Sequence, residues 1–81
     1  MSKYYRYVVR NGFCVLEIRP NKEIPSEFIL YGDGEAFKKY GSPKDAAHDV
    51  FLRTTGYWVW DQLKDSPDNP LSLDEWEIIE E

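Results

Sequence analysis

The first twenty residues alternate between apolar and polar positions around a central turn signal. Residues 3–10 are rich in tyrosine and valine, which favour strands, and residues 13–19 have the same character. Asn11-Gly12 lies between them, and this dipeptide is typical of a type I′ turn because both central residues of that turn need positive φ. The pattern therefore predicts an N-terminal β-hairpin.

The alternation also assigns the two faces of this hairpin. The residues of one face are all apolar or aromatic and are predicted to face the core: Tyr5, Tyr7, Val9, Cys14, Leu16 and Ile18. The opposite face carries the arginines and is predicted to lie on or near solvent: Tyr4, Arg6, Val8, Arg10, Phe13, Val15, Glu17 and Arg19.

The middle of the chain predicts two further strands. Residues 20–25 are a polar connector, and residues 27–31 have the composition of a third strand. Gly32-Asp33-Gly34 predicts a turn, so residues 35–40 are expected to form a short fourth strand that closes a second hairpin.

A helix is predicted next, over residues 43–55. Ser42 is placed to cap the free amides and Pro43 suits the first helical position, while Asp45 favours the positive end of the helix dipole. An apolar stripe follows at helical spacing: Ala46, Ala47, Val50, Phe51 and Thr54. Gly56 is expected to end the helix and to adopt positive φ.

The last third of the chain leaves alternatives open. Residues 57–63 fit a strand or a helical turn, with helix favoured, and residues 64–70 predict a loop. Residues 73–79 fit either a helix capped by Ser72 or a closing strand. The aromatic and apolar residues expected to close the core are Trp58 or Trp60, with Leu63 and Trp76. The predicted fold class is α+β: one domain over residues 1–81, with an antiparallel sheet opened by the hairpin and one main amphipathic helix on one face.

Composition narrows the class of protein. The 81 residues are 42% hydrophobic with a formal net charge of −5, which is typical of a small acidic globular domain. The N-terminus has no apolar signal segment, and no apolar run approaches the length of a membrane span, so no membrane association is expected. Cys14 is the single cysteine and is predicted to be buried and inert. A reducing, cytoplasmic location is therefore expected.

Charge is divided unevenly along the chain. Residues 1–22 hold five basic and one acidic side chain, whereas residues 57–81 hold one basic and eight acidic side chains. The acidic end has three interpretations: a solvated face, a neutraliser of the basic hairpin within the molecule, or a surface for a basic partner. We expect residues 61–81 to lie close to the hairpin arginines, which are Arg6, Arg10 and Arg19.

Few residues suit catalysis or metal binding. Asp45 and His48 share a helix face, but no hydroxyl, thiol or second histidine nearby completes a catalytic set, so a solvent-facing histidine is the simpler interpretation. The segment 32–35 lacks the spaced carboxylates of a calcium loop. The sequence therefore predicts no enzyme activity, no cofactor and no metal site.

Two surfaces suit binding. The outward face of the hairpin interleaves cations with aromatic rings, as single-stranded nucleic-acid platforms do, through Tyr4, Arg6, Arg10, Phe13 and Arg19. The simpler interpretation is that Arg6 or Arg19 pairs with Glu17 across the strands. The C-terminal segment interleaves carboxylates with apolar residues and is the candidate partner-binding surface: Glu75, Trp76, Glu77, Ile78 and Ile79.

Net negative charge opposes binding to nucleic acid. The sequence therefore favours a small interaction module, a regulator or accessory protein that binds a protein partner and is itself a monomer or a weak homodimer. Single-stranded nucleic-acid binding through the hairpin face is the alternative.

Residues 42–76 resemble a set of short, functionally uncharacterised bacterial and phage proteins. The resemblance is carried by these pieces: Ser42-Pro43, Ala46-Ala47 with Val50, Thr55-Gly56-Tyr57, Trp60-Asp61, and Pro70-Leu71-Ser72 leading to Trp76. The hairpin lies outside the resemblance, which implies a stand-alone small α+β domain and carries over no activity.

Overall fold

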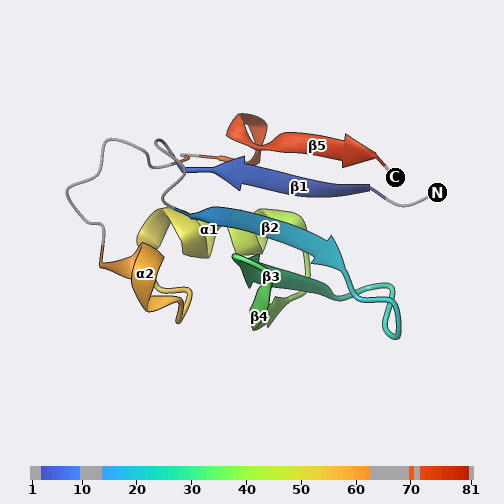
Figure 1. The fold of residues 1–81 in the computed structure, drawn as a ribbon. Helices are drawn as coiled ribbons and strands as arrows, with labels where there is room; N and C mark the ends of the chain where they lie inside the picture. The colour runs from blue at the N-terminus through green and yellow to red at the C-terminus, as the bar shows by residue number, and fades with distance from the viewer. Residues whose placement is uncertain (1–2, 10–13, 63–69, 71, 81) are drawn as a thin grey trace.

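The computed structural model describes residues 3–9, 14–62, 70 and 72–80. Within these ranges five strands form one antiparallel sheet in the order β4-β3-β2-β1-β5 (Figure 1). The strands are β1 (Lys3–Val8), β2 (Val15–Pro20), β3 (Phe28–Gly32), β4 (Glu35–Tyr40) and β5 (Glu77–Glu80). The helix α1 (Pro43–Leu52) covers one face of the sheet, so the α+β fold class is confirmed.

The first two strands confirm the N-terminal hairpin and the faces assigned to it. Tyr5 lies opposite Ile18 and Tyr7 opposite Leu16, and all four side chains point towards α1. Leu16 and Ile18 are fully buried, and Cys14 is 1% exposed. The turn expected at Asn11-Gly12 lies outside the described residues.

The second hairpin also follows the sequence pattern. β3 and β4 are joined by a turn in which Asp33 and Gly34 both have positive φ, 50° and 90°. The register shifts beside Leu30, which lies opposite Lys38, whereas Tyr31 lies opposite Ala36. Phe37 is thus the extra residue of a β-bulge, and its ring stacks on Tyr57 with 4.5 Å between the ring centres.

The start of α1 is as predicted. The Ser42 hydroxyl accepts a hydrogen bond of 3.2 Å from the backbone N–H of Asp45, and Pro43 occupies the first helical position. The helix buries Ala46, Ala47 and Val50 against the sheet, because these residues recur at helical spacing.

The end of α1 differs from the prediction. The helix stops at Leu52, and Arg53 takes the left-handed conformation with φ of 59°, so an end at Thr55 before Gly56 is wrong. Gly56 has the expected positive φ of 91°, but it lies in the turn after the helix, and Thr54 is exposed rather than part of the apolar stripe.

Asp61 stabilises the turn that follows the early end of α1. Its carboxylate accepts hydrogen bonds from the Thr55 hydroxyl at 2.8 Å and from the Gly56 backbone N–H at 2.9 Å. A helix that continued through Thr55 and Gly56 would carry these donors away from Asp61.

The two ambiguous segments are now resolved. Residues Trp58–Asp61 form the short helix α2, which agrees with the helix favoured for this region. Residues Leu73–Glu75 form one 3-10 turn, η2, and β5 follows it, so this segment contains both predicted alternatives. The loop expected over 64–70 lies outside the described residues except for Pro70, which is buried.

Trp60 rather than Trp58 closes the core. Trp60 is fully buried and its indole N–H donates to the Val50 carbonyl at 2.9 Å, whereas Trp58 is 70% exposed. Trp76 is 5% exposed, and the Tyr7 ring packs between the two buried indoles at 6.4 Å from Trp60 and 5.6 Å from Trp76. The predicted contribution of Leu63 lies outside the described residues. None of the helices described is long and apolar enough to span a membrane.

Substitution of Ser42 tests the helix cap. Ser42→Ala removes the acceptor for the Asp45 N–H and is expected to lower the free energy of unfolding by about 0.5–2 kcal/mol in urea denaturation. Ser72→Ala is the matched control, because the Ser72 side chain makes no capping hydrogen bond to η2. Equal losses in the two variants would contradict the cap.

Substitution of Gly32 tests the packing of Tyr57 against the sheet. A Cβ at position 32 would overlap the Tyr57 ring, so Gly32→Ala is expected to lower the free energy of unfolding by about 1–3 kcal/mol. At Gly41 no described atom lies within 4 Å of an added Cβ, so Gly41→Ala is expected to change stability by less than about 0.5 kcal/mol. A harmless Gly32→Ala substitution would show that the ring does not lie there.

Candidate interaction surface

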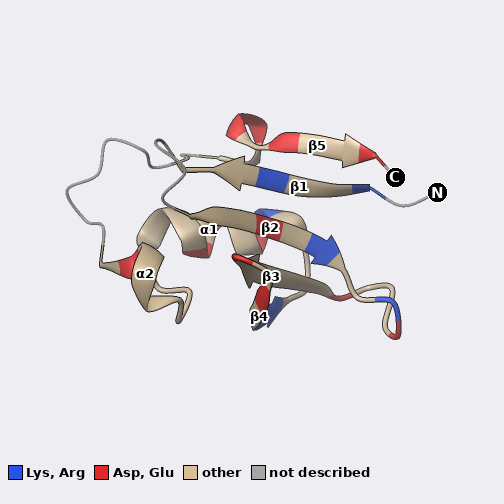
Figure 2. Ribbon diagram, in the orientation of Figure 1, with Lys and Arg blue, Asp and Glu red and all other residues tan. Residues whose placement is uncertain are grey.

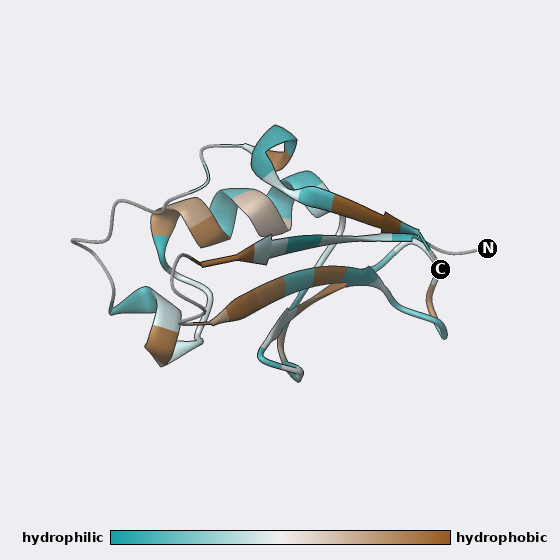
Figure 3. Cartoon of the chain, turned by 45° about the horizontal axis from the view of Figure 1, so that its top comes forward, coloured by the Kyte–Doolittle hydropathy of each residue, from teal (hydrophilic) through white to brown (hydrophobic). Residues whose placement is uncertain are grey.

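The sheet face turned away from α1, called here the outer face, is not covered by any element in the described part of the chain (Figures 1 and 3). Strand register places its residues in two rows. The first row runs from β3 to β5 and contains Tyr31, Glu17, Arg6 and Glu77. The second row runs from β4 to β5 and contains Lys39, Ile29, Arg19, Tyr4 and Ile79.

The outer face combines residues from both candidate surfaces of the sequence. Tyr4 from the hairpin lies opposite Ile79 of β5, and Arg6 lies opposite Glu77. Arg19 lies beside Tyr4, while Arg10 and Phe13 fall outside the described residues. β5 therefore joins the acidic end of the chain to the basic hairpin in one surface.

Sequence reasoning missed two residues of this face, Ile29 and Tyr31. Both are half-buried on β3 and point away from the core, opposite in direction to the buried Leu30 between them. The alternation within residues 28–32 was the signal that could have identified them.

The C-terminal candidate surface is only partly brought together. Trp76 is expected both to close the core and to lie on this surface; its place in the core is confirmed and its place on the surface is wrong, because it is 5% exposed and packs against Tyr7. Ile78 is 55% exposed and points to the α1 side of the edge strand β5, and Glu75 is exposed in η2. Figure 3 shows the hydrophobic middle of β5 between hydrophilic ends. Only Glu77 and Ile79 of this set lie on the outer face.

The arginines of the outer face are paired within the molecule. An Arg6 Nη2 lies 3.0 Å from Glu77 Oε1, which is one instance of the predicted approach of the acidic end to the hairpin. Arg19 Nε lies 3.0 Å from Glu17 Oε1 on the same strand, so Arg19 pairs along β2 rather than across strands. Partly exposed pairs of this kind each contribute about 0–1 kcal/mol, but they neutralise the centre of the face.

A groove runs along β2 and β3 on the outer face and is called here the outer groove. Its volume is about 550 Å³, and its lining includes the half-buried rings of Tyr4 and Tyr31. The guanidinium of Arg19 lies 3.7 Å from the centre of the Tyr4 ring.

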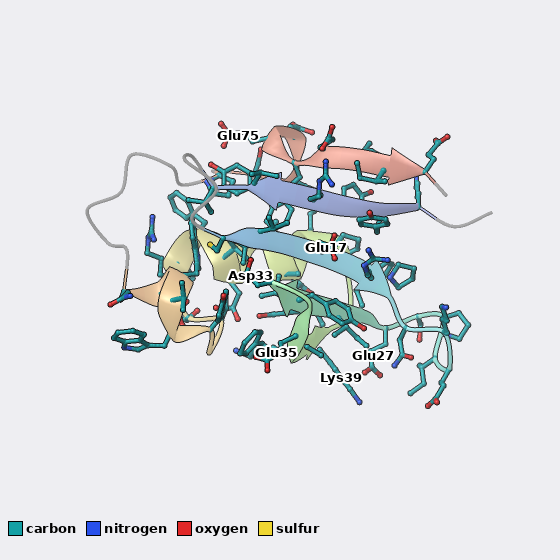
Figure 4. The ribbon with its side chains drawn as sticks, in the orientation of Figure 1. Glu17, Glu27, Asp33, Glu35, Lys39 and Glu75 are labelled. Atoms are coloured by element: carbon teal, nitrogen blue, oxygen red, sulfur yellow. The ribbon has the colours of Figure 1, made fainter. Side chains whose placement is uncertain are left out.

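One end of the outer groove is basic, and this basic end consists of Arg19 and Lys22. Figure 2 shows the corresponding blue segments near the end of β2 and in the loop after β2. Lys3 also borders the groove, but the alternation of β1 turns its side chain to the α1 side, with Tyr5. Glu17 is the acidic residue of the lining, and Figure 4 shows it in the middle of β2. The groove lining is therefore net positive, although the chain carries a net charge of −5.

A second polar cluster surrounds Asp49 of α1. Its carboxylate accepts hydrogen bonds from Tyr40 at 2.6 Å, from Thr54 at 2.6 Å and from Lys38 at 2.9 Å. Burial alone would raise the pKa of Asp49, but these three donors lower it below its usual range. Because Tyr40 and Lys38 lie on β4 and Asp49 lies on α1, two of these hydrogen bonds join the helix to the sheet and stabilise their packing.

Candidates for catalysis or metal binding remain isolated. Asp45 and His48 are both exposed near the start of α1. No group of three or more histidine, cysteine, aspartate or glutamate side chains among the described residues is arranged to hold a metal ion. The absence of enzyme activity stays a prediction.

Comparison with known proteins found no matching family model, no matching curated protein and no matching solved structure. The resemblance of residues 42–76 to short bacterial and phage proteins stays a prediction.

Cys14 is expected to react slowly with thiol reagents. Burial, with a smaller contribution from the Asp33 carboxylate, raises the pKa of its thiol from 9.0 to about 11. Since the thiolate is the reacting form, this shift alone lowers the labelling rate at pH 8 about 100-fold relative to the urea-unfolded chain. Native and unfolded protein labelled at similar rates would contradict the burial of Cys14.

Proposed function

We propose that this protein is a small, non-catalytic interaction module that binds another protein through its outer face, as a regulator or accessory of that partner. The uncovered and partly apolar sheet face carries the proposal. An antiparallel sheet with one solvated face usually presents polar residues there, whereas this face presents Tyr4, Ile29, Tyr31 and Ile79.

The composition of the outer face suits a protein partner. Tyrosine and arginine are enriched where protein interfaces gain most of their binding energy, and Tyr4 and Arg19 lie in contact at the side of the outer groove. Ile29 and Ile79 add aliphatic surface in the same row. Such a surface gains energy by excluding water and needs no bound cofactor.

The alternative function is binding of single-stranded nucleic acid to the same face. The two cations at the basic end and the two tyrosines of the groove favour it. Two observations weigh against it: Arg6 is neutralised by Glu77, and the ring face of Tyr4 is occupied by Arg19, which leaves less aromatic surface for bases. A net charge of −5 also repels a polyanion.

Site-specific photo-crosslinking in cells tests the proposed function. A photoreactive amino acid at position 8, which is 50% exposed on the outer face, is expected to crosslink one specific protein. The same group at position 48, exposed on α1, is the control and is expected not to capture that protein. The purified partner should then bind the parent chain in solution, measured by calorimetry.

Substitutions on the folded protein complete this test. Tyr31→Ala is expected to weaken binding of the purified partner about tenfold, because an interface tyrosine typically contributes more than 1 kcal/mol. Lys44→Ala, on α1, is expected to leave the affinity unchanged. Equal capture from positions 8 and 48 would overturn the proposal, as would binding of oligothymidine to the outer face at physiological salt in place of any protein.

A further inference from the structure

We infer that the outer groove takes an extended acidic segment of the partner protein, whose carboxylates lie at the basic end formed by Arg19 and Lys22. The inference rests on the proposed function, because it states the chemistry of the partner that the outer face would bind.

The shape and lining of the groove suit an extended chain. The groove follows β2 and β3 from the turn at Gly34 to the loop at Asn21 and Lys22, and its volume is about 550 Å³. Ile29 and Tyr31 lie in its middle and offer apolar contact, with the cations at one end. An occupant with apolar residues at its centre and carboxylates at one end would match this order of side chains.

The pairing of the lysines points to an acidic occupant. Lys38 pairs with Asp49 at 2.9 Å and Lys39 with Glu27 at 3.7 Å, so each of these two lysines has a carboxylate within ion-pair distance (Figure 4 shows Lys39 and Glu27). Lys22, by contrast, is exposed and has no carboxylate within ion-pair distance in the part of the chain that is described. This unpaired ammonium group, at the same end of the groove as the Arg19 guanidinium, is complementary to one or two carboxylates.

Arg19 fixes the position of positive charge at the basic end of the outer groove. Its guanidinium is held by Glu17 at 3.0 Å and by the ring of Tyr4 at 3.7 Å, so it is pre-organised at the wall of the groove. The stacking also covers one face of the Tyr4 ring, which leaves less aromatic surface on which a nucleobase could stack. An aliphatic or acidic side chain does not need an open ring face. A short acidic segment also suffers less long-range repulsion from a chain of net charge −5 than an oligonucleotide does.

Titration of the ¹⁵N-labelled full chain with a synthetic peptide tests the inference. The probe is an acetylated and amidated hexapeptide that alternates glutamate with valine, and the control peptide replaces each glutamate with glutamine. We expect the acidic peptide to shift the backbone amide signals of Arg19, Lys22 and Tyr31, and its affinity to fall as sodium chloride rises. The glutamine peptide is expected to bind at least about threefold more weakly.

Exposed lysines provide matched variants that keep the fold. Lys22→Gln is expected to bind the acidic peptide about threefold more weakly than the parent. Lys44→Gln removes an equally exposed lysine from the α1 side and is expected to leave the affinity unchanged. A urea denaturation of each variant confirms that stability is retained.

Other results would overturn the inference. Three of them concern the peptide: equal affinity for the acidic and glutamine peptides, shifts confined to α1, or an unchanged affinity in Lys22→Gln. The other two are tighter binding of hexathymidine than of the acidic peptide, and occupation of the groove by a second copy of the chain in sedimentation. The two proposals fail separately. A specific crosslink from position 8 without peptide binding would leave the protein-binding function standing and overturn the acidic segment. Peptide binding in the groove without any crosslinked protein would count against the function.

Discussion

The burial of Trp60 is the interaction on which the arrangement of the second half of the chain depends. Its ring is fully buried, its indole N–H donates to the carbonyl of Val50, and the guanidinium of Arg53 lies 4.1 Å from the ring centre. A buried indole needs both apolar contact and a partner for its N–H. Val50 supplies that partner near the C-terminal end of α1. The chain must therefore reverse soon after α1, which explains why Arg53 takes a left-handed conformation where a longer helix was expected.

The sheet depends on a second long-range constraint, the pairing of β5 with β1. This pairing brings the last residues of the chain beside the first and places Glu77 against Arg6. The uneven charge of the chain is thereby partly balanced inside one molecule. The outer face keeps charged side chains but little net charge at its centre, and positive charge remains at one end of the outer groove. Specificity for an occupant is expected from this distribution of charge, whereas affinity is expected from the tyrosine and isoleucine side chains.

The titratable side chains inside the fold serve packing, and the outer face is the surface that suits binding. Two titratable groups are used for packing: Cys14 is buried in the core, and the half-buried Asp49 accepts hydrogen bonds from Lys38 and Tyr40 of β4, which connect α1 to the sheet. The outer face differs because most of its residues are half-buried and face no other element of the described chain. A domain of 81 residues has a small core. Its stability with one sheet face uncovered therefore depends on tight packing of the opposite face against α1.

The sequence by itself determined the features that depend on neighbouring residues. Alternation assigned the buried face of the first hairpin, and Ser42 with Pro43 marked the start of α1, because strand period and helix capping are local properties. The end of α1, the choice of Trp60 over Trp58 and the choice between a core and a surface position for Trp76 were decided only by the tertiary structure. Each of these depends on a packing partner elsewhere in the sequence, such as Tyr7 for Trp76. Local propensity does not indicate which distant residue will pack against a given side chain. The outer face is of the same kind, since only strand order brings Tyr4 beside Ile79.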